Sequence, residues 1–211
     1  MQRKVPTISS TGSTAATQDE ESGLRRALKL SASALKADDI PFALAGGYAL
    51  WAHGAPEPVH DVDLVLTEQH VPAAVASLSA AGFRIERPPE DWLFKAYLDD
   101  DLVDVLHRVS GEPVMDEQVE AAVELELLGI RLPVLTPTPV MVAKLRSLTE
   151  HYCDFAPLLP VARAVREQLD WAALRQVGEE SPFAEGLLLV LDRLEIAPAG
   201  VSHSESRRSS S

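Results

Sequence analysis

The sequence has very little cysteine and no long apolar run, and these two absences narrow the class of protein. Cys153 is the single cysteine among 211 residues, which excludes an intrachain disulfide framework and a zinc cluster built from several thiolates. The longest apolar runs, such as 187–191, are core-sized and well short of the roughly 18 residues that a membrane span requires. We therefore expect a protein of a reducing compartment, by default the cytoplasm, with no membrane partner.

Positive charge is also scarce. The 19 Lys and Arg residues stand against 32 Asp and Glu residues, and the formal net charge is -13. This balance argues against a surface built mainly to neutralise nucleic-acid phosphates, so phosphate chemistry would need bound cations. No lysine or arginine occurs from Ala37 to Phe83, whereas the segment from Lys144 to Arg175 holds five. An RNA, if one binds, is expected on that later segment.

The order of the segments predicts an α+β fold with one domain and a helical appendage. Serine- and threonine-rich ends, 1–22 and 196–211, lack apolar periodicity and are expected to be flexible tails. Between them we expect an α/β core over 23–135 and a C-terminal helical bundle over 136–195. The expected sheet is small and mixed, with flanking helices.

Apolar patterning predicts the individual elements of this fold. The expected helices are an amphipathic one beginning near Leu24 and segments 48–53, 71–81, 140–149, 154–168, 171–177 and 183–194. The expected strands are 41–45, 61–67, 83–87, 93–98 and 102–108, followed by one or two strands within 124–135 that break at Gly129.

Three aspartates interrupt otherwise apolar strands. Asp61 and Asp63 lie in Asp-Val-Asp-Leu-Val-Leu, and side chains two residues apart on a strand point to the same face. Adjacent carboxylates repel each other unless a cation lies between them, and hard oxygen ligands suit Mg²⁺, with Mn²⁺ as a substitute. Asp104, in Val-Asp-Val, would join the pair if its strand is a neighbour. The same Asp-Val-Asp pattern could instead mark a charged edge strand.

A glycine pair, Gly46-Gly47, follows the predicted strand 41–45 directly and opens a short helix. Residues without Cβ at such a turn let backbone amides approach phosphate oxygens, although glycine pairs between strand and helix are also common without a function. Three carboxylates near this turn fit a two-metal site that holds a triphosphate and activates an acceptor hydroxyl. Asp104 would then be a ligand and a candidate general base.

The glycine pair, the Asp-Val-Asp strand and the Val-Asp-Val strand together resemble the nucleotidyltransferase superfamily that includes DNA polymerase β. The stretch from Leu132 to Arg146, followed by Asp154 and a helical bundle, is most similar to the AbiEii/MenT-type nucleotidyltransferase toxins. The resemblance covers roughly 41–174.

The resemblance implies a role for each matching residue. It implies that Gly46 and Gly47 contact phosphates and that Lys144 reaches the triphosphate. It also implies that the metal-binding, catalytic carboxylates are Asp61, Asp63 and Asp104. Asp154 matches an acidic residue near the same site, although by composition it could equally be a charge at a helix N-terminus.

The sequence departs from this family in the loop before the first aspartate. Many relatives carry Arg and Thr where this chain has Glu57 and Val59. A phosphate contact is then either missing or supplied by His60, Lys144 or Arg146. By composition alone, Lys144 and Arg146 could also belong to a solvated helix face.

The resemblance implies an enzyme that transfers a nucleoside monophosphate from an NTP, such as ATP, to an acceptor hydroxyl and releases pyrophosphate. It favours RNA as acceptor, in particular a tRNA 3′ end, as in a toxin–antitoxin pair with an antitoxin protein as partner. A small antibiotic-type molecule is the alternative acceptor, and a protein hydroxyl is a third. A degenerate relative that binds nucleotide or a partner without catalysis is a further alternative, which Glu57 and Val59 keep open.

Overall fold

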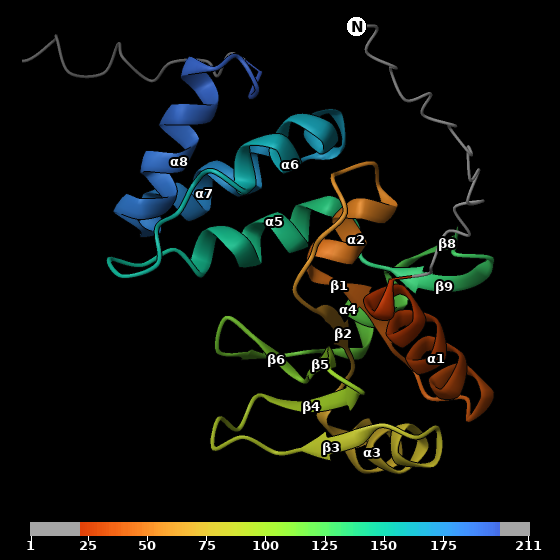
Figure 1. Ribbon diagram of the computed structural model, residues 1–211. Helices are drawn as coiled ribbons and strands as arrows, with labels where there is room; N and C mark the ends of the chain where they lie inside the picture. Colours follow the sequence, from red (N-terminus) through yellow and green to blue (C-terminus); the bar gives the residue numbers. More distant parts are fainter. Residues whose placement is uncertain (1–21, 199–211) are drawn as a thin grey trace, which may run out of the picture.

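A computed structural model of the chain describes residues 22–198, so the predicted tails lie almost wholly outside the described residues (Figure 1). Nine strands form a seven-stranded mixed sheet and a two-stranded hairpin. The strands are β1 Ala43–Ala45, β2 Val62–Val65, β3 Arg84–Glu86, β4 Leu93–Leu98, β5 Asp101–Leu106, β6 Arg108–Val109, β7 Glu112–Pro113, β8 Val123–Leu127 and β9 Ile130–Val134. The α+β class with a mixed sheet is thus confirmed.

Helices flank this sheet and form the C-terminal part of the described chain. They are α1 Gly23–Ala37, α2 Gly46–Ala52, α3 Val71–Ala80, α4 Asp116–Glu120, α5 Pro137–Arg146, α6 Leu158–Val165, α7 Trp171–Glu180 and α8 Pro182–Arg193, with short 3-10 turns at Glu68–His70 and Arg166–Gln168. Helices α5 to α8 gather at the top of Figure 1, beyond α2, while α1 and α3 lie against the sheet. No helix within 22–198 is long and apolar enough to cross a membrane.

The sheet order is β3-β4-β5-β2-β1-β9-β8, which places β2 and β5 at the centre. Strand β2 runs parallel to β5 and antiparallel to β1, and β4 forms an antiparallel hairpin with β5. The two predicted strands that break at Gly129 form the antiparallel pair β8–β9. This order brings segments from both halves of the α/β core next to one another.

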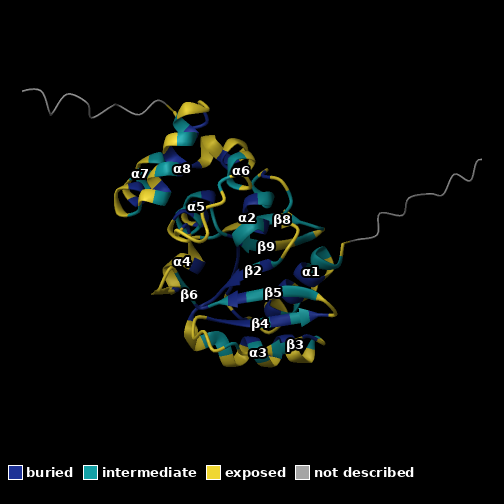
Figure 2. Cartoon of the chain, turned by 60° about the vertical axis from the view of Figure 1, so that its left-hand side comes forward, coloured by how far each residue is buried: buried dark blue, intermediate teal, exposed yellow. Residues whose placement is uncertain are grey.

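Apolar side chains bury the two faces of the sheet unequally. The large core includes Val62 and Leu64 of β2, both fully buried, together with residues of α1, α3 and the C-terminal helices. A smaller cluster on the opposite face contains Ala45 and Val65 with Val119 of α4. Figure 2 shows the central strands as mostly buried and the outer faces of the helices as exposed. Asp63 alternates with Val62 and Leu64, and therefore points away from the large core.

Several predicted boundaries shift, for local reasons. The helix expected from Asp154 begins only at Leu158, because the Asp154 carboxylate accepts a hydrogen bond from the backbone N–H of Ala156 in a turn that precedes the helix. The helix expected from Val140 instead begins at Pro137, where proline suits a first helical position.

The strand expected to reach Arg108 ends at Leu106, and the chain then forms the small hairpin β6–β7 and helix α4, neither of which was predicted. At the C-terminal end, Ile196 and Ala197 are buried in the large core, so ordered packing extends beyond α8.

Candidate active site

The three aspartates predicted from sequence converge at the centre of the sheet. Asp61 directly precedes β2, Asp63 lies on β2, and Asp104 lies on β5. The parallel register places Asp63 opposite Asp104. One carboxylate oxygen from each of the three residues lies within 4.8 Å of the others. The condition set for Asp104, that its strand lies beside that of Asp63, is met, and the three side chains form one cluster, which we call the carboxylate triad.

The electrostatics of the triad favour a bound cation. Burial, followed by repulsion from Asp61, raises the pKa of Asp63 to about 7. Burial also raises the pKa of Asp104, against the opposing effect of Lys95. Both changes mean that the negative charges are unfavourable where they stand. Since carboxylate oxygens are the ligands that Mg²⁺ and Mn²⁺ prefer, the donor set fits a divalent ion, which would relieve this repulsion.

Lys95 is a site residue that the sequence analysis missed. It lies on β4 directly opposite Asp104, and its Nζ donates a hydrogen bond to Asp104 Oδ1 at 3.1 Å. The signal was present in the sequence, because a hairpin that turns at Asp99-Asp100 pairs Leu98 with Asp101 and, continuing the register, Lys95 with Asp104.

The glycine pair meets the triad at close range. Gly46 has a φ of +56°, which favours glycine, and a Cβ there would clash with the Asp63 carboxylate. A Cβ on Gly47 would lie 2.8 Å from Cβ of Pro58, on the loop that leads to β2. Both positions therefore require glycine so that the turn can pack against the strand and loop that carry the first two aspartates.

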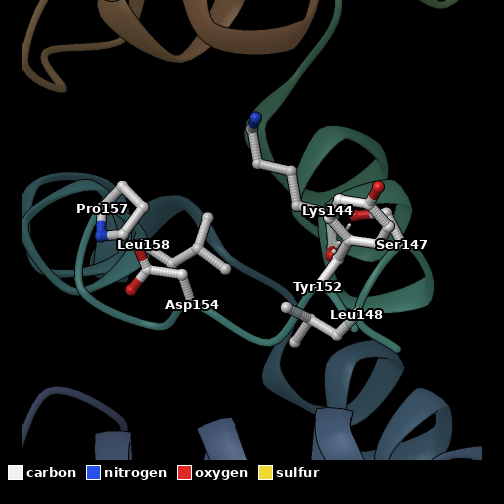
Figure 3. Close-up of a pocket in the computed structure, with 7 residues that line it drawn as sticks. All are labelled: Lys144, Ser147, Leu148, Tyr152, Asp154, Pro157 and Leu158. Atoms are coloured by element: carbon white, nitrogen blue, oxygen red, sulfur yellow. Dashed lines mark hydrogen bonds between the residues drawn. The ribbon is translucent and has the colours of Figure 1, made fainter. Parts of the chain in front are cut away.

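Lys144 and Asp154 line the same pocket. This pocket of about 250 Å³ lies between α5 and the start of α6 (Figure 3). In Figure 3, Lys144 extends upward from α5, and Asp154 lies across the pocket from it. Lys144 also acts electrostatically on Asp63, lowering the pKa of that carboxyl. The two residues thus share a cavity, and Lys144 acts on a carboxylate of the triad.

The remaining predicted residues have other surroundings. Arg146 Nη2 lies 3.5 Å from Glu180 Oε2 on α7 and forms an ion pair with it. Both side chains are about half exposed. His60 is exposed on the loop before β2. Lys144 therefore acts on a carboxylate of the triad, whereas Arg146 pairs with Glu180 and His60 is exposed.

Glu57, in the loop before β2, has a basic partner from another element. Arg25 of α1 donates from Nε and Nη2 to its two carboxylate oxygens at 2.8 and 2.6 Å. These bonds lower the pKa of Glu57. The fully buried Tyr48 places its hydroxyl 3.4 Å from the same carboxylate, and burial followed by Glu57 raises the pKa of Tyr48 to about 12. Glu57 thus ties α1 to the helix that follows the glycine pair.

No protein-family model matches the sequence, and no curated protein is significantly similar to it. Solved structures with a similar arrangement include a candidate nucleotidyltransferase from Thermotoga maritima, at 19% identity and a TM-score of 0.47 over 57% of this chain and 82% of that one.

The chain is also similar to the antibiotic-resistance factor ANT(2'')-Ia, at 16% identity and a TM-score of 0.49 over 80% of this chain and 90% of that one. A third is the lincosamide antibiotic adenylyltransferase LnuA, at 12% identity and a TM-score of 0.47 over 64% and 92% of the two chains. Similarity at this level assigns no substrate, and the chemistry of the site follows from its own side chains.

Proposed function

We propose that this protein is a metal-dependent nucleotidyltransferase that moves a nucleoside monophosphate from an NTP to an acceptor hydroxyl. The observation that carries the proposal is the convergence of Asp61, Asp63 and Asp104 within 4.8 Å, against a glycine turn that a Cβ would obstruct. A charged edge strand, the alternative interpretation of Asp-Val-Asp, does not fit the central position of β2.

The position of each site residue suggests its role in the reaction, either binding of the metal or binding of the phosphates. Asp61, Asp63 and Asp104 would hold the divalent ion, which when bound neutralises the triphosphate and polarises the reacting groups. The backbone at Gly46 and Gly47 would hold the phosphate oxygens and Lys144 would bind the triphosphate as a charge partner.

The proposed chemistry balances as a single displacement at the α-phosphorus. The acceptor oxygen forms a new bond to the α-phosphorus, and the bond between the α-phosphorus and its bridging oxygen to the β-phosphate breaks. Pyrophosphate leaves with that electron pair. Asp104 is the candidate base that takes the proton of the acceptor hydroxyl.

Two classes of acceptor are considered, an RNA and a small molecule. The toxin resemblance favours the 3′-hydroxyl of RNA or tRNA, docked on the helical part of the chain. A specific observation favours a small molecule: three of the five basic residues from Lys144 to Arg175 are engaged with carboxylates, in the pairs Arg146–Glu180, Arg166–Glu167 and Arg175–Asp192. A polyanion gains affinity mainly from free positive charge, and the chain carries a net charge of -13.

The test is transfer of label from α-³²P-labelled NTPs in the presence of Mg²⁺, with total tRNA in one arm and a panel of small hydroxyl compounds in the other. We expect Asp104→Asn to lower the rate by about 10²–10⁴-fold, as for loss of a general base, and Asp63→Asn to abolish transfer. The matched control is Asp100→Asn, an exposed carboxylate of the β4–β5 turn.

Full activity in Asp63→Asn would refute the metal site. Mg²⁺-dependent NTP binding without transfer to any acceptor would instead favour the non-catalytic binding module. Label on tRNA alone would support the toxin-type reaction. A neutralising protein partner should then be sought.

A further inference from the structure

Lys95 occupies a defined place at one corner of the carboxylate triad. Its side chain and that of Asp104 are 26% and 14% exposed, so their ion pair is largely withdrawn from solvent. The pairing follows from strand register, since the two residues lie opposite each other on β4 and β5. Cross-strand partners of opposite charge stabilise each other, and the strand register keeps these two side chains adjacent.

The Lys95–Asp104 pair affects how many cations the triad can bind, because it changes the net charge of the site. When ionised, the triad carries three negative charges, and Lys95 supplies one positive charge at the Asp104 side. Its ammonium engages Oδ1 of Asp104, which leaves Oδ2 as the oxygen free of that bond. An ammonium and a divalent ion that bind the same carboxylate repel each other strongly where water is partly excluded. Lys95 also acts electrostatically on Asp61 and Asp63, so its positive charge offsets part of the negative charge of the whole triad.

We propose that Lys95 is a positioning residue. Its ammonium group binds Asp104 where a second divalent cation would otherwise bind. The nucleotide-free chain then binds one divalent ion at the triad, and Lys95 keeps Asp104 oriented. This inference rests on the proposed function, because it takes the triad to be a metal site. It goes further by assigning the ion stoichiometry to a residue outside the triad.

The experiment is a titration of the full-length chain with Mn²⁺ alone, in which the electron paramagnetic resonance signal of free Mn²⁺ reports how many ions are bound. We expect one Mn²⁺ in the wild type, two in Lys95→Met and one again in Lys95→Arg, which restores the charge. Asp63→Asn should lose the ion, which identifies the triad as the site that is measured. Lys36→Met, which removes an exposed lysine of α1, is the matched control and should bind one ion.

Two Mn²⁺ ions in the wild type, or one ion only in Lys95→Met, would overturn the inference. The failure of the proposed function has a different signature. A wild type with one ion and a Lys95→Met variant with two, but no transfer of labelled nucleotide, would leave the role of Lys95 in place and refute the enzyme. A wild type that binds two ions without nucleotide but transfers labelled nucleotide would support the enzyme and refute the role of Lys95.

Discussion

Substitution of Asp63 by asparagine should stabilise the metal-free protein while it abolishes the proposed activity. The carboxyl of Asp63 has a pKa of about 7 in the folded chain against an ordinary value of 3.8. Between these two values the unfolded chain loses its proton first, so the folded state loses stability as the pH rises. Asparagine keeps the shape of the side chain without the charge and therefore removes this cost.

The size of the effect follows from the same pKa. Each tenfold change in proton affinity is worth about 1.4 kcal/mol, so a pKa displaced from 3.8 to about 7 corresponds to roughly 4 kcal/mol at high pH. Part of the repulsion is shared with Asp61 and Asp104, so we expect a gain of about 2–4 kcal/mol at pH 8. The gain should shrink as the pH falls and vanish below about pH 3, where both states carry the proton.

The assay is urea denaturation of the wild type and Asp63→Asn with a chelator present, at several values between pH 4 and pH 8. Asp100→Asn, at an exposed position, should change the free energy of unfolding by under about 0.5 kcal/mol throughout. Addition of Mn²⁺ should stabilise the wild type and leave Asp63→Asn unchanged, because only the native triad binds the ion. Equal or lower stability of Asp63→Asn at pH 8 would refute the assignment of Asp63 as an electrostatically unfavourable group.

Three further substitutions test the surroundings of the site. Gly46→Ala should abolish Mg²⁺-dependent NTP binding in calorimetry and cost about 1 kcal/mol of stability, because its Cβ meets the Asp63 carboxylate at a φ of +56°; normal binding would contradict the close approach. Glu57→Gln should lower the free energy of unfolding by about 1 kcal/mol at pH 7, since it weakens the two bonds from Arg25, and this difference should disappear in acid as Glu57 takes up its proton. Tyr48→Phe should change thermal stability by under about 1 kcal/mol, because the hydroxyl bond to Glu57 is long at 3.4 Å; a larger loss would show that the buried hydroxyl matters more than its geometry indicates.

The sequence could predict the faces of the strands but not which strands are neighbours. The alternation in Asp-Val-Asp-Leu-Val already placed Asp61 and Asp63 on one face, because strand periodicity is local. The approach of Asp104 depends on the parallel pairing of β2 with β5, which are separated by α3, β3 and β4. Such pairing is decided by the whole sheet, so Asp104 could be named only on the condition that its strand lay alongside.

Contacts between distant segments escaped prediction for the same reason. Arg25 and Glu57 lie 32 positions apart, and nothing in either local pattern shows that α1 packs where its arginine can reach the loop before β2. Glu57 could be singled out in the sequence, but its structural partner Arg25 could not. Lys95 differs, because the register of a tight hairpin is local information and could have identified it.

Side chains of β2 alternate between the two faces of the sheet, so the residues that stabilise the strand lie on one face and the reactive carboxylate lies on the other. Val62 and Leu64 are fully buried in the large core, while Asp63 between them presents its carboxylate on the opposite face. Apolar burial on one side of the strand stabilises the fold and fixes the backbone that carries the charge on the other. The repulsion within the triad is therefore tolerated in a strand that cannot shift register, since a shift by one residue would bring Asp63 into the core. This coupling explains how three carboxylates can stay close together before any cation binds.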